Sequence, residues 1–264
     1  MFRVLLSAVA MAAATGAHAS FVTLYDQNFE EPNDPPGFVN GFSPGSGYDD
    51  VSQQLVNDLY GGQPSGFFFA QSFTVETLLL TGTEAFGSGF NDPTGTGGTY
   101  ALGMLGSAQN DRLGLSFDVG AFDFFNFALD VSSIGISGGS GSPFTRPTDV
   151  PTFTFRLYDN PSGIPGVSGN DTLLDEGSLT GTASHLDTFD WTRGTFAFDA
   201  SGSTNGNVTL QIDLTAGAYA AFDNFLITAS NTPGGGLTPV PVPPALPLLA
   251  AAVIGLGALS RRRA

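Results

Sequence analysis

Two acidic motifs far apart in this sequence have the residue types of a calcium site. The first is Phe29-Glu30 and the second is Phe222-Asp223-Asn224-Phe225. Asp223 alternates in phase with Phe225 and Ile227, so its carboxylate is predicted to face the apolar side of a strand, where it needs a cation or hydrogen-bond donors. Calcium prefers hard oxygen ligands such as Glu30 and Asp223. The alternative is an aspartate that backbone amides or arginine side chains satisfy.

A second acidic stretch runs from Asp159-Asn160-Pro161-Ser162-Gly163 to Asn170-Asp171. Its spacing does not match the EF-hand loop, because no glutamate closes a twelve-residue pattern. We interpret this stretch as a long hairpin loop, with a calcium-binding loop as the alternative.

No set of residues has the pattern of a catalytic site. His185 lies in a polar, turn-like stretch, Ser184-His185-Leu186-Asp187, without a nucleophile elbow beside it. Glycoside hydrolysis needs two converging carboxylates, and neither Glu76 nor Glu84 is singled out as one of a pair. The absence of cysteine excludes disulfides and thiolate metal sites. We therefore predict that the protein is not an enzyme, with a secreted hydrolase as the remaining alternative.

Trp191 is the candidate residue for carbohydrate binding. It lies in Asp190-Trp191-Thr192-Arg193, where polar neighbours suit a strand that contacts sugar. An exposed aromatic ring would provide a stacking surface. The alternative is that this tryptophan belongs to the core of a β-sandwich.

The two acidic motifs are similar to the first and last strands of carbohydrate-binding jelly rolls. The resemblance rests on Phe29-Glu30 and on the segment from Phe222 to Phe225. It implies that Glu30 and Asp223 help to hold a structural calcium ion.

The elements that must position these residues are predicted to be strands. Leu113–Val119, Pro151–Asp159 and Asn207–Thr215 alternate apolar and polar residues, which is typical of half-buried antiparallel strands. Further strands are predicted at Phe21–Tyr25, Gly66–Val75, Tyr100–Leu105, Phe124–Val131, Thr172–Leu179, Phe189–Phe198 and Tyr219–Thr228. One short helix is predicted at Val51–Tyr60, with Asp49 or Asp50 as its cap. About ten strands without crossover helices predict an all-β fold, a two-sheet antiparallel sandwich of jelly-roll type spanning residues 20–230.

The N-terminus has the three parts of a secretory signal peptide. Arg3 is followed by the apolar run Val4 to Ala14 and by the small-residue site Ala17-His18-Ala19. This order predicts a signal helix over residues 1–19 with cleavage after Ala19.

The C-terminus reads as a linker, a short apolar helix and a basic end. Residues 231–244 are rich in glycine and proline, and residues 245–264 are predicted to form a transmembrane helix ending in Arg261-Arg262-Arg263. Its apolar part, Ala245 to Leu259, is about 22 Å long as a helix, which is short for a hydrocarbon core of about 30 Å. The arginines should stay in the cytoplasm, with the rest of the protein on the exported side.

The segment Val240-Pro241-Val242-Pro243-Pro244-Ala245, the apolar stretch and the three arginines together resemble PEP-CTERM sorting signals. The match is closest to the variant with a Val-Pro-Leu-Pro-Ala start, from which Val242 and Pro244 depart. The resemblance implies export across the inner membrane of a Gram-negative-type cell and cleavage by an exosortase. It also implies release from the transient membrane anchor to the cell surface or medium. The alternative is a permanent C-terminal anchor.

The strong negative charge of the region between the two end segments excludes some classes of binding partner. All 24 acidic residues but only four arginines, and no lysine, lie between the two end segments, which gives the body a formal net charge of −20. Nucleic acids and anionic lipids need a basic surface and are excluded. We predict a non-enzymatic cell-surface or extracellular-matrix protein. The alternative is a calcium-stabilised carbohydrate-binding module with an extracellular polysaccharide as its partner.

Overall fold

The computed structural model describes residues 21–31, 60–64, 67–72, 75–80, 91–104, 111–134, 150–167, 171–182, 185, 187–217 and 219–237. The predicted signal peptide, the sorting motif, the apolar stretch with its arginines, and residues 51–59 of the predicted helix lie outside these ranges. No helix among the described residues is long and apolar enough to cross a membrane.

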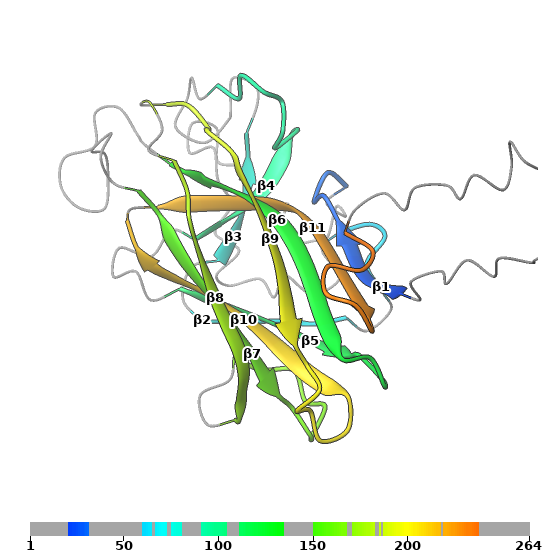
Figure 1. Ribbon diagram of the computed structural model, residues 1–264. Helices are drawn as coiled ribbons and strands as arrows, with labels where there is room; N and C mark the ends of the chain where they lie inside the picture. Colours follow the sequence, from blue (N-terminus) through cyan, green and yellow to red (C-terminus); the bar gives the residue numbers. More distant parts are fainter. Residues whose placement is uncertain are drawn as a thin grey trace, which may run out of the picture. The chain divides into compact units, whose positions relative to one another are not determined.

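The described residues form two antiparallel sheets (Figure 1). The strands are β1 (Phe21–Gln27), β2 (Phe69–Ser72), β3 (Val75–Leu79), β4 (Tyr100–Met104), β5 (Arg112–Asp118), β6 (Phe124–Ser133), β7 (Thr152–Asp159), β8 (Leu173–Thr180), β9 (Thr192–Asp199), β10 (Asn207–Ala216) and β11 (Ala220–Ser230). The six-stranded sheet has the order β3-β4-β11-β6-β9, with β1 also paired to β11, and the five-stranded sheet has the order β2-β5-β10-β7-β8. The predicted two-sheet antiparallel sandwich is confirmed.

One predicted strand proved to be two. The segment Gly66–Val75 contributes β2 to the five-stranded sheet, where it pairs with β5, whereas Val75 begins β3 of the other sheet, which pairs with β4. Local alternation cannot detect this change of sheet, because it reports which residues are apolar and not which strand lies alongside.

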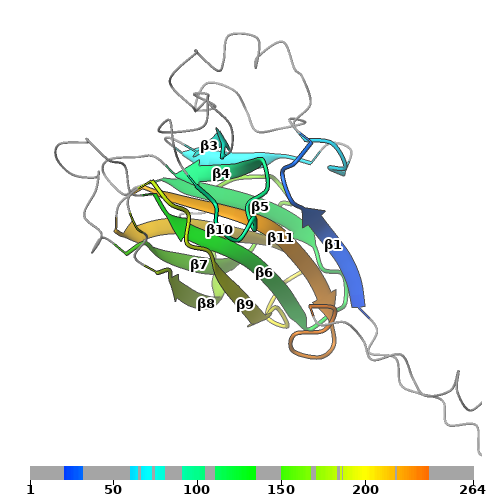
Figure 2. The same cartoon turned by 90° about the horizontal axis from the view of Figure 1, so that it is seen from above.

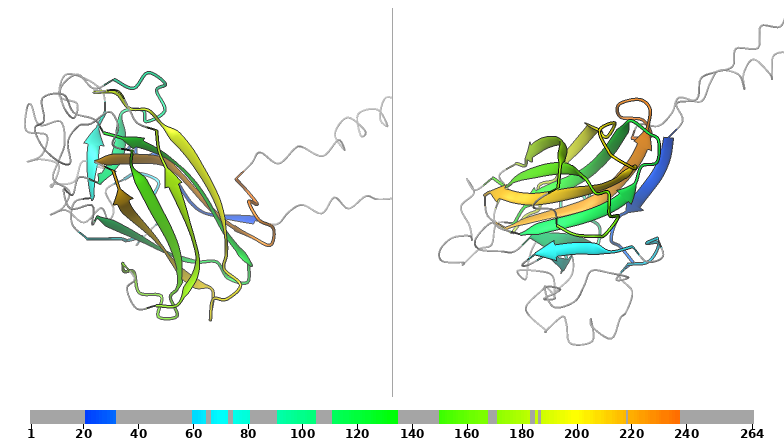
Figure 3. Two further views of the ribbon diagram at one scale, coloured as in Figure 1. Left: turned by 60° about the vertical axis from the view of Figure 1, so that its left-hand side comes forward. Right: turned by 90° about the horizontal axis from the view of Figure 1, so that it is seen from below.

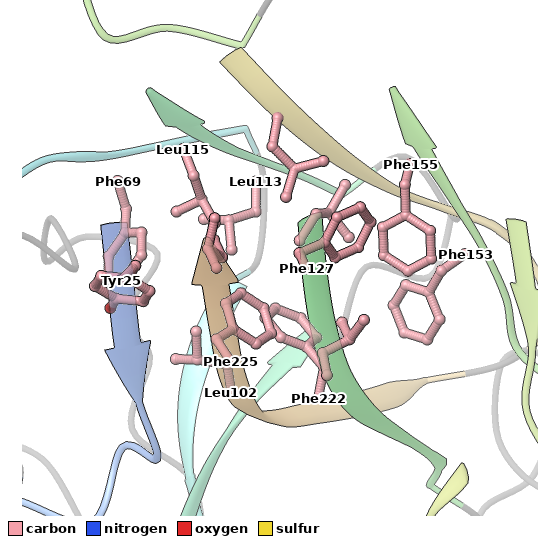
Figure 4. Packing of buried hydrophobic residues seen from close by; sticks show 14 of the residues in the cluster. Tyr25, Phe69, Leu102, Leu113, Leu115, Phe127, Phe153, Phe155, Phe222 and Phe225 are labelled. Carbon is pink, nitrogen blue, oxygen red and sulfur yellow. The ribbon is translucent and has the colours of Figure 1, made fainter. Parts of the chain in front are cut away.

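Phenylalanine rings fill the space between the sheets (Figure 4). On β6, Phe125, Phe127 and Leu129 face this core. The ring of Phe127 stacks on Phe196 at 4.7 Å between centroids and meets Phe155 edge to face at 5.2 Å. Such aromatic pairs add to the free energy gained by burying the rings.

Strand β11 organises the six-stranded sheet (Figure 2). Along one edge it pairs first with β4, through Ala220–Phe222, and then with β1, from Phe225 to Ser230. A β-bulge interrupts its pairing with β6 between Asp223 and Leu226. The end of β1 and the beginning of β4 therefore meet at this bulge.

The chain folds back after β11. Asn126 on β6 donates to Ser230 Oγ at 2.8 Å, and its Oδ1 accepts the N–H of Gly234 at 2.7 Å. These bonds hold the turns of residues 231–237 against the sheet, beside Phe21 at the start of β1 (Figure 3). Residues 231–237, which the sequence analysis assigned to the linker, thus lie in the folded body.

Candidate functional site

The structure brings Glu30 and Asp223 into one acidic centre at the bulge of β11. The Glu30 carboxylate accepts the backbone N–H of Thr99 at 2.8 Å (Oε1) and 3.0 Å (Oε2), and that of Tyr100 at 3.3 Å. Glu30 follows β1 and Tyr100 begins β4, so this carboxylate joins the two strands that flank the bulge. Glu30 contributes to the electrostatic potential at Asp223. The two acidic motifs, which lie far apart in the sequence, are therefore neighbours in space.

The bulge changes the direction of Asp223. Phe222 and Phe225 both pack in the core, so two residues lie between consecutive core positions instead of one. Asp223 pairs with Asp130 of β6, which alternates with core residues and lies on the outer face of the sheet, the face turned away from the other sheet. The prediction that Asp223 faces the apolar side with Phe225 is wrong, because a bulge shifts the alternation by one residue.

Asp223 is nevertheless only 1% exposed. Burial and, to a smaller extent, the charges of Glu30, Asp130 and Asp92 raise the pKa of its carboxyl to about 9, against the lowering effect of the Asn224 N–H. Arg193 partly balances this charge: it donates to Asp130 Oδ2 and to the carbonyl oxygen of Asn224, each at 2.9 Å. A carboxylate in such a place needs a proton or a cation.

A loop between residues 91 and 99 covers the acidic centre. The Asp92 carboxylate accepts the N–H groups of Gly95 at 3.0 Å and Gly97 at 2.8 Å, which closes the loop on itself. Asn224 donates to the carbonyl oxygen of Thr96 at 2.9 Å, which ties the loop to the bulge. The sequence analysis missed Asp92, since Asn91-Asp92-Pro93 has the composition of an ordinary turn.

Trp191 packs beneath the same loop. Its ring stacks on Phe189 with centroids 5.7 Å apart, and its Nε1 donates to Asp92 at 3.2 Å. A Cβ on Gly97 would lie 2.4 Å from the ring, so the loop rests directly on the indole. The residue predicted to contact carbohydrate is therefore placed in a small cluster at the acidic centre.

Strained backbone is concentrated around this centre. The non-glycine residues with positive φ in the described part of the chain are Phe29 (57°), Asp187 (56°) and Asn224 (53°). Phe29 precedes Glu30, Asn224 follows Asp223, and the carbonyl oxygen of Asp187 accepts the N–H of Asn91. Such conformations cost about 1–3 kcal/mol each and persist where the surroundings enforce them, often at functional sites.

The donor set of the acidic centre suits a hard cation. Carboxylate and carbonyl oxygens are the ligands of calcium, whereas zinc and copper sites need imidazole or thiolate groups. No group of three or more His, Cys, Asp or Glu side chains among the described residues could hold a metal alone. A calcium ion at Glu30 and Asp223 would therefore need backbone carbonyl oxygens as further ligands, which calcium accepts.

The other acidic stretch is a hairpin loop between β7 and β8, as interpreted from its sequence. Burial raises the pKa of Asp159, but hydrogen bonds from Thr204, Ser203 and Asn160 lower it more, so the net pKa lies below its usual value. This carboxylate is satisfied by the protein. His185 is an exposed loop residue.

A second candidate site is a half-open cleft of about 190 Å³ at one end of the five-stranded sheet. Its lining includes Phe67, Phe68, Ser116, Asn160, Pro165 and Asn207. Phe68 is 47% exposed. Phe67 beside it stacks on Tyr25 at 4.7 Å and touches Phe117 at 5.5 Å, so the wall that carries Phe68 is anchored in the core.

Polar groups face the exposed ring across the cleft. The side-chain amide of Asn207 makes no hydrogen bond to the described residues, and the exposed Asp118 uses Oδ1 to accept the N–H of Gly120. Ser116 shares a hydrogen bond of 2.9 Å with Thr209. The cleft thus offers one apolar surface and several free hydrogen-bonding positions, the usual composition of a small-ligand site.

The run of three phenylalanines at the start of β2 is a sequence signal for this cleft. Phe67, Phe68 and Phe69 are consecutive, and successive side chains of a strand point to opposite faces, so they cannot all enter one core. Phe69 is buried and Phe68 is the ring that remains outside.

No family model matches this chain, and no curated protein matches it in sequence. Several solved structures are similar. The C-terminal family 22 carbohydrate-binding module of Clostridium thermocellum Xyn10B is 13% identical with a TM-score of 0.40, over 82% of this chain and 96% of that one. The CBM22-1 xylan-binding domain of Paenibacillus barcinonensis Xyn10C is 14% identical with a TM-score of 0.37, over 82% and 99%.

The mannan-recognising module TmCBM27 is 13% identical with a TM-score of 0.33, over 80% of this chain and 99% of that one. At these identities and scores the similarity concerns the fold alone.

Proposed function

We propose that the body of this protein is a carbohydrate-binding module that acts outside the cell, with the cleft beside Phe68 as its glycan site. The observation that carries this proposal is the pairing of an exposed, rigidly backed phenylalanine with amide, carboxylate and hydroxyl groups that keep hydrogen-bonding positions open to a ligand in one cleft. A sugar has the complementary surfaces: its C–H groups stack on an aromatic ring while its hydroxyls bond to polar side chains.

Binding rather than cleavage fits the charges of the cleft. Among the described residues that line it, Asp118 is the one carboxylate. Canonical glycoside hydrolysis requires two carboxyl groups on either side of the scissile bond. The proposed role is therefore non-enzymatic.

In this proposal a calcium ion at the acidic centre stabilises the module. The burial of Asp223 and the like charges around it support this role, because a divalent cation would offset both the desolvation and the repulsion that raise the pKa of this carboxyl. Glu30 and Asp223 supply the carboxylate oxygens. The cation would tie β1, β4 and β11 together and leave the cleft, on the other sheet, unchanged.

In this proposal, the signal peptide and the C-terminal tail determine where the protein is located. The signal peptide ending at Ala19 exports the body, and the tail beginning at Val240 is recognised by an exosortase and removed with its arginines. The mass of the mature C-terminus tests this part: an end between Val240 and Ala245 supports it. A membrane-bound protein that retains Arg261-Arg262-Arg263 contradicts it.

Glycan binding is tested with the purified protein on a panel of soluble polysaccharides that includes xylan and mannan. Phe68→Ala should weaken binding about tenfold, equivalent to about 1.4 kcal/mol. Leu173→Ala is the matched control, because Leu173 is a similarly exposed apolar residue (45%) on β8 and does not line the cleft. No binding by the unmodified protein, or equal losses in both variants, would reject the glycan site.

A further inference from the structure

The loop after β7 lies across the outer face of the five-stranded sheet. We call its residues 161–167 the strap. A Cβ on Gly114 of β5 would lie 2.2 Å from the carbonyl oxygen of Gly166, so the strap rests directly on the bare backbone of this strand. Gly163 and Pro165 of the strap also form one wall of the cleft beside Phe68.

Polar side chains that an outer sheet face normally turns to water are buried here. Thr209 and Gln211 alternate along β10 with the core residues Leu210 and Ile212, so they point to the outer face. Gln211 is the register partner of Gly114, and it is only 3% exposed. The strap is the segment that lies over this position.

Gln211 has a buried acceptor without a donor. Its Nε2 donates to both carboxylate oxygens of Asp213, at 2.9 and 3.1 Å, which fixes the orientation of the amide. Its Oε1 is buried and has no hydrogen-bond partner in the described part of the chain, and the same is true of Ser72 Oγ on the same face. Buried polar atoms nearly always have partners. A ligand hydroxyl would supply the missing donor.

The strap is weakly attached to the sheet. Among the described residues, the hydrogen bonds of residues 162–167 are with one another and with Asn160, which donates to the carbonyl oxygen of Ile164 at 3.1 Å. One further bond, from Asn205 to the carbonyl oxygen of Pro161, holds its first residue. Ile164 is 70% exposed. Few bonds would have to break for the strap to lift from Gly114.

We infer that the strap lifts when ligand binds, and that the cleft then continues along the sheet to Gln211, whose Oε1 accepts a hydroxyl of a second part of the glycan. The inference rests on the proposed function and deepens it. Gln211 lies four residues along β10 from Asn207 of the cleft lining, and a strand rises about 3.4 Å per residue, so the extension adds about 14 Å of site. The ligand is then a polysaccharide bound along its length, not a terminal sugar.

The charges of the extended site select a neutral glycan. Arg112 Nε lies 3.3 Å from Asp213 Oδ1, and Arg156 contacts both Asp213 (2.5 Å) and Glu176 (3.5 Å). Each arginine is therefore already paired with a carboxylate. No unpaired cation in the described part of this face would offset the charge of a uronic acid or a sulfate group.

The test compares two-sugar and six-sugar oligosaccharides prepared from xylan and from mannan, with polygalacturonate as the acidic polymer. The six-sugar ligand should bind the unmodified protein at least tenfold more tightly than the two-sugar ligand. Gln211→Met, which keeps the side-chain length, should reduce six-sugar affinity about fivefold and leave two-sugar affinity unchanged. Gln63→Met is the matched control, since Gln63 Oε1 is also buried without a partner among the described residues but lies outside the cleft lining.

The strap itself is tested with Gly114→Ala. The added methyl group displaces Gly166, so backbone amides of the strap should exchange faster with deuterium and six-sugar affinity should rise severalfold. Equal affinity for both ligand lengths, equal losses with Gln211→Met, or preference for polygalacturonate would overturn the inference while leaving glycan binding intact. If Gly114→Ala does not fold, the Gln211→Met comparison decides. Absence of any glycan binding would instead reject the proposed function.

Discussion

Asp223 is almost completely buried and surrounded by like charges, whereas Phe68 is half exposed beside amides, a hydroxyl and one exposed carboxylate. At the acidic centre, residues with positive φ lie beside both carboxylates, and hydrogen bonds join the end of β1, the loop of residues 91–99 and the bulge of β11. The cleft has an ordinary backbone and side chains with free bonding positions. The perturbed chemistry of Asp223 accompanies burial and contacts between distant segments, whereas recognition requires exposed groups with free hydrogen-bonding positions. Four changes should separate the two regions.

The largest effect should be a loss of stability with rising pH when calcium is chelated. The pKa of Asp223 is about 9 in the folded protein and about 4 in the unfolded chain. Stability is then greatest at low pH and falls as pH rises from 4 towards 9, by about 1.4 kcal/mol per pH unit. Asp223→Asn should remove this slope in melting curves between pH 5 and 8. A slope that persists in the variant would place its origin elsewhere.

Calcium should have the next largest effect. At a concentration one hundred times its Kd, calcium stabilises a folded protein by about 2.7 kcal/mol, which corresponds to about 5–10 °C in melting temperature for a body of this size. The chelator should lower the melting temperature of the unmodified protein and of Phe68→Ala alike. Asp223→Asn should not respond. An unmodified protein that is indifferent to the chelator would argue for protonation instead of metal binding.

Trp191→Ala should destabilise the protein by about 2 kcal/mol, because it removes a ring packed on Phe189 and Gly97 and the donor to Asp92. Denaturant unfolding gives this value. Glycan affinity, measured where the variant remains folded, should stay within twofold. A selective loss of affinity at unchanged stability would transfer the glycan site to Trp191.

The smallest change in stability should come from Phe68→Ala, within about 0.5 kcal/mol, since exposed side chains contribute little to folding. The same substitution should reduce glycan affinity about tenfold. Isothermal titration and urea unfolding of one sample give both numbers. A large loss of stability would mean that Phe68 is a structural residue and that the cleft is not an independent site.

The amino-acid sequence alone determined the strands and their class. Alternation within each segment and the turn residues between them are local properties, so they predicted an all-β sandwich and placed Glu30 and Asp223 near its first and last strands. Other local patterns, the order of basic, apolar and proline residues near each end, predict the export signal and the sorting tail. Both stay predictions.

Tertiary structure decided how those strands present their side chains. The bulge at Asp223 and Asn224 reversed the direction of a carboxylate that alternation had assigned to the core. Asn224 reaches Thr96 across 128 residues of sequence, and Asp92 meets Trp191 across 99, so neither contact has a local signal. The strap over Gln211 depends on the bare backbone of Gly114 in another strand. Period-two patterns specify which residues are apolar, but which segments converge is fixed only when the whole chain packs.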